Sequence, residues 1–320
     1  MEPGLSTPDL SVILCTHNPR EPYLRRVLAG LRAQTLAAAK WELLLVDNAS
    51  QPPVMERFDL SWHPQARHVR EEELGLTPAR LRGIRESHAE ILVFVDDDTV
   101  LAPDYLESAL AVAKQWPFVG VWGGSYLPEY ETPLPAWVGD QVWRLLCCDV
   151  KADVWSNLRT EFTTIPAGAG MCVRRPVVQK YLERCVQHPA AVGLDRSGKG
   201  VAGYGDIDLA YCAMDLGLGT GKSTRLRLTH LIPAARLTLD YFVRHAEGDA
   251  ASNMLFRALR GLPVQKPKPQ TLISSLRWWV HRLIHHVSRE QYEIQKAHQR
   301  GLEKGWELAS EHLRQKSAGR

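Results

Sequence analysis

The run Asp96-Asp97-Asp98 follows directly on the apolar residues 91–95 and is the part of the sequence best suited to chemistry. Three adjacent carboxylates repel one another, so they cannot share a dry site without a compensating positive charge. A divalent cation supplies that charge, and carboxylate oxygens favour Mg²⁺ or Mn²⁺, which commonly complete their coordination with substrate phosphate. The run therefore predicts chemistry on a phosphorylated substrate, and a solvated acidic turn is the alternative.

Two other apolar runs also end in polar residues. Residues 11–15 lead into Thr16-His17-Asn18, and residues 41–46 lead into Asp47-Asn48. Together with residues 91–95, these runs predict three strands. We expect their polar ends to form one crevice.

Two helices are expected between these strands. Apolar residues recur at helical spacing over 23–36, and a second helix is predicted over 76–86, with Thr77 as its N-cap and Pro78 at its first position. Continuous apolar strands alternating with helices are typical of an α/β fold with a parallel sheet covered on both faces. In such sheets ligands bind beyond the carboxyl ends of the strands, where the polar residues stand.

The composition limits the class of protein. The chain has 320 residues, of which 45% are hydrophobic and 23% are charged, so it can form one large domain, with or without an appendage. A net charge of +3 without a basic stripe in the first two thirds argues against nucleic acid as a partner. Six cysteines without a CxxC spacing, and no apolar stretch of about 18 residues, predict a cytoplasmic protein that does not span a membrane.

Six segments, in this order, resemble the inverting family 2 glycosyltransferases of the GT-A fold. They are SVILCTHN (11–18), LLLVDNAS (43–50), GLTPARLRGI (75–84), ILVFVDDDT (91–99), PAGAGMCVRRP (166–176) and GYGDIDLAYCAMDLG (203–217). The resemblance covers about residues 10–245. It implies a GT-A domain over 1–260, with a nucleotide-sugar-binding half at about 10–125 and an acceptor half at about 126–260, followed by a helical C-terminal extension over 261–320.

The resemblance also implies a reaction. A metal-dependent enzyme of this family moves a sugar, with inversion, from a nucleotide-sugar donor to a hydroxyl of a saccharide or a lipid-linked saccharide. We expect UDP as the nucleotide and cell-surface polysaccharide or glycoconjugate synthesis as the setting. Two alternatives stay open, namely a catalytically inactive relative that binds glycan or nucleotide sugar, and a sugar-nucleotide pyrophosphorylase, although the Gly-rich opening of the latter is missing.

On the nucleotide side, the resemblance assigns Thr16, Asn18 and Asp47 to the base and ribose. The alternatives are ordinary turn chemistry for Thr16 and Asn18, and the capping of a turn or helix for Asp47. Arg80 matches an arginine that reaches nucleotide or phosphate, although the asparagine that follows it in the family is Leu81 here.

At the diphosphate, the resemblance assigns a loop and a metal. Gly168 and Gly170 belong to a small-residue loop that lets the backbone approach the donor sugar, with a tight strand connection as the alternative. The Asp-x-Asp pattern of the family places Asp96 on the ribose side and Asp98 on Mn²⁺ or Mg²⁺. Asp97 then contributes through water or points away. Asp96 is a second candidate ligand, and so is His230, for which a purely structural role is the alternative.

On the acceptor side, inverting transfer needs a carboxylate opposite the leaving group to remove the acceptor proton. Residues 205–209 resemble the Glu-Asp-x-Asp-Leu motif of the family, which precedes a helix expected over 209–216. On this alignment Asp206 is the base, and Asp208 is a supporting residue or a helix N-terminal charge. Because the first acidic position is Gly205, a shift by one residue makes Asp208 the second candidate base.

Two regions carry weaker signals. Some of the aromatic residues between 116 and 155 are candidates for an acceptor groove, with core packing as the alternative; they are Trp116, Trp122, Tyr126, Tyr130, Trp137, Trp143 and Trp155. A helix predicted over 272–287 combines aromatic and basic residues, which favours peripheral contact with the inner face of a membrane or packing against the protein's own domain or a partner. Residues 288–316 predict a mainly polar helix.

Overall fold

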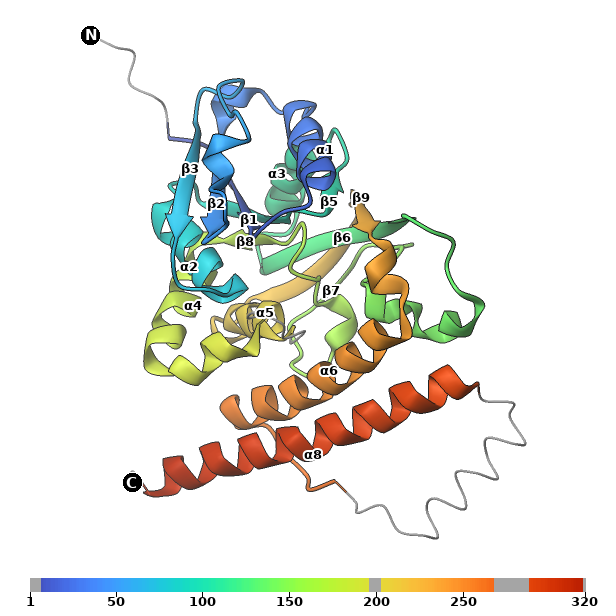
Figure 1. Cartoon of the computed structure of the whole chain (residues 1–320). Helices are drawn as coiled ribbons and strands as arrows, with labels where there is room; N and C mark the ends of the chain where they lie inside the picture. Colours follow the sequence, from blue (N-terminus) through green and yellow to red (C-terminus); the bar gives the residue numbers. More distant parts are fainter. Residues whose placement is uncertain (1–6, 196–202, 268–287, 319–320) are drawn as a thin grey trace. The chain divides into compact units, whose positions relative to one another are not determined.

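The computed structural model describes residues 7–195, 203–267 and 288–318 (Figure 1). They divide into two compact units. Unit 1 comprises the described residues of 1–129, 146–193 and 205–232. Unit 2 comprises those of 130–145, 194–204 and 233–320.

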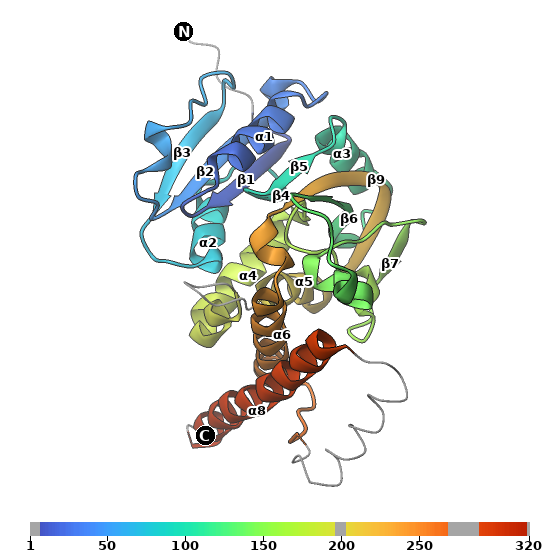
Figure 2. The same cartoon turned by 45° about the vertical axis from the view of Figure 1, so that its right-hand side comes forward.

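Unit 1 begins with a parallel half-sheet. Its strands are β1 (Leu10–Thr16), β2 (Trp41–Asn48), β3 (Ala66–Glu71) and β4 (Ile91–Asp96). They lie in the order β3-β2-β1-β4, and all three pairings are parallel (Figure 2). Every residue of β1 and β2 is buried, as expected for strands covered on both faces.

Two helices cover opposite faces of this half-sheet. They are α1 (Glu21–Arg32) and α2 (Leu76–Glu86). Alternate β1 residues, Val12 and Leu14, share a core with the apolar side of α1, whereas Ile13 faces α2, where a Cβ on Gly83 would lie 2.4 Å from its Cγ2. Side chains alternate across a strand, so one short run of sequence supplies both cores.

The sheet continues with antiparallel strands. These are β5 (Thr99–Leu101), β6 (Val119–Tyr130), β7 (Val154–Ser156), β8 (Cys172–Arg174) and β9 (Gly219–Ile232). The order beyond β4 is β8-β6-β9-β5, and β7 pairs with β9. The helices here are α3 (Tyr105–Gln115), α4 (Arg175–Gln187) and α5 (Gly205–Asp215). The predicted α/β class, with a parallel half-sheet near the N-terminus, is confirmed.

Unit 2 contains two long helices, α6 (Leu239–Leu259) and α8 (Arg289–Ala318), side by side in Figures 1 and 2. A Cβ on Gly301 of α8 would lie 2.2 Å from the carbonyl oxygen of Glu247 in α6, and one on Gly305 would lie 2.8 Å from the Cα of Ala251. Residues four apart share a helix face, so these glycines let the two backbones approach closely. The predicted polar helix over 288–316 is α8, whereas the helix predicted over 272–287 lies outside the described residues.

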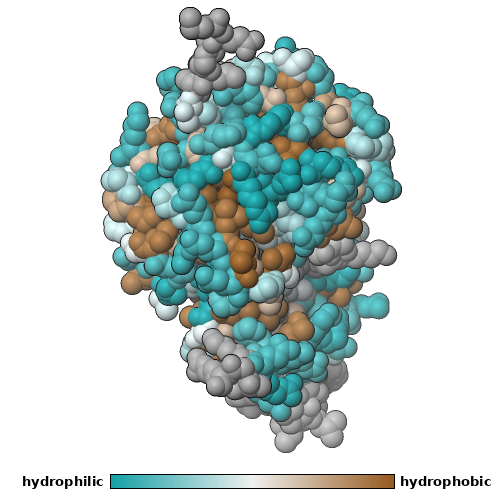
Figure 3. Space-filling model, turned by 90° about the vertical axis from the view of Figure 1, so that its left-hand side faces the viewer, coloured by the Kyte–Doolittle hydropathy of each residue, from teal (hydrophilic) through white to brown (hydrophobic). Residues whose placement is uncertain are grey.

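Short 3₁₀ helices connect these elements. They are η1 (Ala38–Lys40), η2 (Val54–Glu56), η3 (Ala136–Leu145), η4 (Phe162–Thr164), η5 (Pro189–Leu194) and η6 (Ala234–Leu237). Among the described helices, none is long and apolar enough to cross a membrane. The face of the molecule in Figure 3 is mostly hydrophilic, with separate hydrophobic patches.

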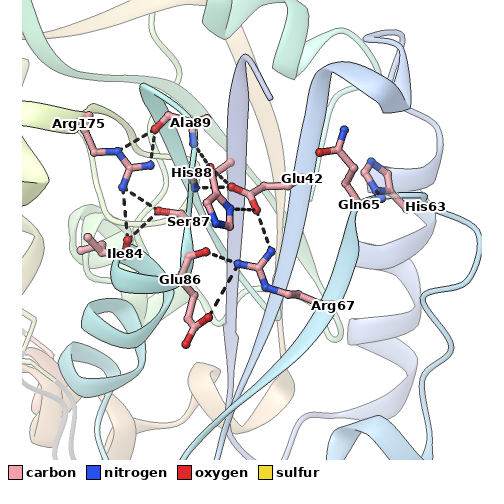
Figure 4. A network of polar contacts seen from close by, with 11 residues as sticks. Glu42, His63, Gln65, Arg67, Ile84, Glu86, Ser87, His88, Ala89 and Arg175 are labelled. Atoms are coloured by element: carbon pink, nitrogen blue, oxygen red, sulfur yellow. Dashed lines mark hydrogen bonds and ion pairs between the residues drawn. The ribbon is translucent and has the colours of Figure 1, made fainter. Parts of the chain in front are cut away.

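A polar network fastens the amino ends of the parallel strands (Figure 4). The buried carboxylate of Glu42 in β2 accepts hydrogen bonds from the Ser11 hydroxyl of β1 at 2.7 Å and from the Arg67 guanidinium of β3 at 3.0 Å. The backbone N–H of His88, just before β4, donates to the same carboxylate at 2.6 Å. The partners of Glu42 come from β1, from β3 and from the segment just before β4. One side chain of β2 therefore links all four parallel strands.

The structure corrects two local predictions and, for three aromatic residues, confirms the alternative of core packing. Thr77 is not an N-cap, because α2 already begins at Leu76 after Gly75, whose φ of 144° strongly favours glycine. Helix α5 begins at Gly205 rather than at residue 209. Of the aromatic residues between 116 and 155, three are buried and belong to the core, namely Trp116, Trp122 and Tyr126.

Candidate functional site

The carboxyl ends of β1, β2 and β4 lie at one edge of the sheet. Thr16 is in register with Asp47 of β2, and Cys15 is in register with Asp96 of β4. The Thr16 hydroxyl donates to Asp97 Oδ2 at 2.5 Å. The structure therefore brings together the polar residues that end these three strands.

The three carboxylates of the acidic run face different partners. Asp96 Oδ1 lies 3.9 Å from Arg80 Nη2, and Asp97 accepts the hydrogen bond from Thr16. Asp98 is buried, and its Oδ2 lies 3.7 Å from Nε2 of His230. His230 arrives there because β5 and β9 pair with Thr99 opposite His230. Each carboxylate of the run thus has a neighbour from a different element, α2, β1 or β9.

Arg80, Gly168 and Asp206 form a second group in unit 1. Arg80 lies on α2 with its side chain only 6% exposed. A Cβ on Gly168 would lie 2.3 Å from Arg80 Nη2, so this position accommodates no side chain unless Arg80 moves. The Gly168 N–H donates to Asp206 Oδ2 at 2.8 Å. The Arg80 guanidinium on α2, the Gly168 N–H and the Asp206 carboxylate on α5 therefore lie next to one another in this order.

The two candidate bases have different surroundings. Asp206 is half-buried in the first turn of α5, and its Oδ1 accepts from the backbone N–H of Ile207. Asp208 is fully buried, and both its oxygens accept from Arg184 Nε of α4, at 3.0 and 2.8 Å. Asp208 therefore joins α4 to α5 through an ion pair, and Asp206 is the less buried of the two carboxylates.

Asp47 holds the turn that follows β2. Its Oδ1 accepts from the N–H of Ser50, and its Oδ2 accepts from the N–H of Val54 and from Arg70 Nη1 at 2.6 Å. Burial raises the pKa of this carboxyl, but these hydrogen bonds outweigh it and leave the pKa below its usual value. Its contacts are those of the turn cap that was the alternative, and its contact with ribose stays a prediction.

Asn18 belongs to the same corner of the sheet. Its N–H donates to the Ser50 hydroxyl, its Oδ1 accepts from the N–H of Gln51, and its φ is 46°. Asparagine tolerates this left-handed conformation better than most residues. The contacts of Asn18 in the structure are those of a turn residue, and its contact with the base stays a prediction.

Two buried tyrosines hold the loop that contains Gly168 and Gly170. The hydroxyl of Tyr105 donates to the carbonyl oxygen of Gly170 at 2.6 Å, and that of Tyr126 donates to Ala167 O at 3.0 Å. Neither role is predicted from the sequence, in which Tyr126 is a candidate for an acceptor groove. The only signal in the sequence is a tyrosine in an otherwise apolar segment, which indicates burial of a hydroxyl but not its partner.

Residues 11–171, half of the chain, match the family described as Glycosyl transferase family 2. The chain belongs to this family. The matched residues include the three strand ends, Arg80 and the loop with Gly168 and Gly170. The family predicted from the six segments is confirmed, and with it the class of enzyme, a glycosyltransferase.

Several known glycosyltransferases are similar to about a third of the chain. The putative glycosyltransferase EpsH of Bacillus subtilis is 30% identical over 112 residues, which cover 34% of this chain and 31% of that protein. Validoxylamine A glucosyltransferase of Streptomyces hygroscopicus subsp. limoneus is 33% identical over 115 residues, covering 34% of this chain and 25% of the relative. The chain therefore matches about a third or less of the length of these proteins.

The solved structures similar to this family 2 chain include TarS of S. aureus. The structure of TarS 1–349 in complex with UDP has a TM-score of 0.48 and 13% identity, and covers 96% of this chain and 91% of that one. The complex of the same TarS fragment with UDP-GlcNAc has a TM-score of 0.49 and 12% identity, covering 95% and 92%.

Proposed function

We propose that this protein is a metal-dependent inverting glycosyltransferase that moves a sugar from a nucleotide-sugar donor to a hydroxyl of a saccharide or lipid-linked saccharide. UDP is the expected nucleotide, and cell-surface polysaccharide or glycoconjugate synthesis is the expected setting. The observation that carries the proposal is the hydrogen bond from Gly168 N–H to the half-buried Asp206, beside Arg80. In this arrangement unit 1 offers the Asp206 carboxylate to the acceptor and the Arg80 guanidinium to the donor phosphates.

Asp98 and His230 fit a divalent cation that arrives with the donor. Their side chains approach to 3.7 Å, and both are nearly buried. The described residues contain no group of three or more His, Cys, Asp or Glu side chains placed to hold a metal. Protein sites for Mg²⁺ at nucleotides commonly use one or two carboxylates and leave the other positions to phosphate and water. When bound, Mn²⁺ or Mg²⁺ supplies Lewis-acid stabilisation of the leaving diphosphate.

The remaining steps belong to residues of the chain. Arg80 offers a buried guanidinium to the diphosphate, which gains charge as the glycosidic bond breaks. Asp96, Asp97, Thr16, Asn18 and Asp47 are proposed for the ribose and base. Asp206 takes the proton of the acceptor hydroxyl as that oxygen attacks the anomeric carbon from the side opposite the diphosphate.

The acceptor and the location complete the proposal. One relative is a glucosyl-dolichyl phosphate glucuronosyltransferase of Haloferax volcanii, 22% identical over 147 residues, whose name specifies a lipid-linked acceptor. This supports a lipid-linked saccharide as one acceptor class for the present chain. We propose a cytoplasmic protein with a GT-A domain over 1–260 and a helical C-terminal extension over 261–320, and peripheral contact with the inner face of a membrane through residues 272–287.

Asp206→Asn tests the assignment of the base. We expect turnover to fall by about 10²- to 10⁴-fold while the dissociation constant of the donor stays within about twofold, because the carboxylate acts only on the acceptor proton. The matched control is Asp215→Asn on the same helix, whose carboxylate pairs with Arg159 near the surface. Turnover is measured by release of nucleoside diphosphate with a panel of nucleotide sugars, and donor binding by calorimetry.

Two results would contradict the proposal. Retained turnover in Asp206→Asn would sink the assignment of the base. Metal-dependent donor binding by the wild type without turnover on any acceptor would favour the binding relative, an alternative that Gly205 at the first acidic position of the motif keeps open.

A further inference from the structure

The peptide group between Ala167 and Gly168 connects a buried tyrosine to the proposed base. A peptide group is planar, and its carbonyl oxygen and N–H point in opposite directions. The carbonyl of this group accepts from the Tyr126 hydroxyl at 3.0 Å. The N–H of the same group donates to Asp206 Oδ2 at 2.8 Å. This planar peptide group therefore links the Tyr126 hydroxyl, in β6, to the Asp206 carboxylate, in α5.

Tyr126 is firmly held on its side of this plane. Its backbone N–H donates to Cys148 O at 2.7 Å, and its backbone carbonyl accepts from Cys148 N–H at 3.1 Å. Only 4% of the residue is exposed. Gly123, on the same strand, lets Pro166 lie close, since a Cβ there would be 2.6 Å from Pro166 Cβ and 3.2 Å from the Tyr126 hydroxyl oxygen. The phenol is therefore enclosed by the loop that it holds.

The hydroxyl acts as a permanent donor. Burial, and then the negative charge of Asp206, raise the pKa of Tyr126 well above its usual value. The hydroxyl therefore keeps its proton throughout the range in which an enzyme works. The residue on the other side of the peptide bond is glycine, whose backbone adopts many conformations, so the orientation of this peptide depends on the groups bonded to it.

We propose that Tyr126 is a positioning residue for Asp206, acting through the Ala167–Gly168 peptide group. Its hydrogen bond turns the Gly168 N–H toward the carboxylate and polarises the peptide, which strengthens the second hydrogen bond. The carboxylate is thereby held in one orientation for the acceptor proton. The inference rests on the proposed function, because it takes Asp206 as the base.

Tyr105 provides a matched control in the same loop. Its hydroxyl also is buried and donates to a loop carbonyl, that of Gly170, at 2.6 Å. The N–H of that peptide group belongs to Met171 and donates to Gly168 O at 3.3 Å, not to Asp206. Tyr105→Phe therefore removes an equivalent hydrogen bond from the loop without touching the peptide that bonds the base.

The test compares four variants with the wild type, namely Tyr126→Phe, Tyr105→Phe, Asp206→Asn and the double variant Tyr126→Phe with Asp206→Asn. Loss of one buried hydrogen bond predicts a fall in kcat of about five- to tenfold in Tyr126→Phe, with the KM for the donor unchanged. We expect Tyr105→Phe to stay within about twofold of the wild type. In the Asp206→Asn background, Tyr126→Phe should have no further effect, because its path to the reaction is already lost.

A merely structural role predicts other results. A change in donor KM, an equal loss in Tyr105→Phe, or a further fivefold loss in the Asp206→Asn background would overturn the inference. The Gly168 amide proton, observed by nuclear magnetic resonance with ¹⁵N-glycine, gives a readout without turnover. It should move upfield in Tyr126→Phe and in Asp206→Asn and stay in place in Tyr105→Phe.

This readout separates the inference from the proposed function. If the wild type transfers no sugar from any donor, the proposed function fails, and the amide resonance alone judges the peptide link. An unshifted Gly168 amide in Tyr126→Phe would then overturn the link itself.

Discussion

The ion pair of Asp208 with Arg184 gives a prediction that separates the two candidate bases. Asp208→Asn keeps the size of the side chain and removes its charge. Asp208 is fully buried and Arg184 is 11% exposed, with Nε at 2.8 and 3.0 Å from the two carboxylate oxygens. Removing one partner of a buried pair typically costs about 3–5 kcal/mol. Because Arg184 keeps some access to water, we expect a loss near the lower end, about 3 kcal/mol.

This loss should appear as lower stability with little effect on chemistry. For a large domain each kcal/mol lowers Tm by about 2–4 °C, so Asp208→Asn should melt about 6–12 °C below the wild type. At a temperature where both proteins are folded, its turnover should stay within about threefold. The assays are thermal unfolding followed by circular dichroism and release of nucleoside diphosphate.

Two comparisons complete this prediction. Asp206→Asn, on the same helix but half-buried, should change Tm by less than about 3 °C and abolish most turnover. Adding Arg184→Gln to Asp208→Asn should recover about 2 kcal/mol, since residues of one ion pair do not contribute additively. An unchanged Tm together with a hundredfold loss of turnover in Asp208→Asn would refute the reasoning and make Asp208 the base.

Three further predictions concern the donor site and the core. Asp98→Ala should abolish the Mn²⁺-dependent rise in Tm that UDP gives the wild type, and His230→Gln should reduce it; an undiminished rise in Asp98→Ala would remove the metal role. Gly168→Ala should displace Arg80 and weaken donor binding by about tenfold in calorimetry, whereas Gly193→Ala, which meets open space, should not; equal affinities would show that Arg80 does not touch the donor. Burial lowers the pKa of His63 from 6.5 to about 4. Between pH 6.5 and 4, the imidazole of His63 is therefore protonated in the unfolded chain but neutral in the folded protein, so the free energy of unfolding should fall as the pH decreases through this range. In His63→Phe, which keeps an aromatic ring in contact with Trp41, urea unfolding should show a shallower fall in stability over this pH window, and an identical fall would contradict the assignment.

The sequence predicts those parts of the fold that depend on local pattern. The strands β1, β2 and β4 are largely apolar runs, and α1 has apolar residues at helical spacing, so each of these patterns can be recognised within a single segment. Strand β3 was not predicted. Its residues Arg67, His68 and Arg70 are polar because they bond to Glu42, to Phe58 O and to Asp47, partners that lie far away in sequence.

The candidate site shows the same division. The sequence predicts that the polar residues ending β1, β2 and β4 come together, because the C-terminal ends of parallel strands lie at one edge of a sheet. The hydrogen bonds of the Tyr105 and Tyr126 hydroxyls were not predicted. The loop carbonyl that each hydroxyl meets depends on the packing of α3 and β6 against the loop, which no single segment of the sequence reveals. Arg184, the partner of Asp208, was not predicted for a similar reason, because it lies 24 residues earlier in the sequence, on another helix.

The pairing of β5 with β9 makes the site a late product of folding. Asp98 leaves the ribosome well before His230 and Asp206, and the strand that brings His230 to Thr99 is the last strand of the sheet to be synthesised. Contacts between distant parts of a chain form slowly, because loop closure must precede them. A nascent chain therefore carries its acidic run before it carries His230 and the proposed base, so the proposed donor site stays incomplete until β9 has been made. Synthesis of β9, rather than the appearance of the carboxylates, sets the moment at which the proposed donor binding and transfer become possible.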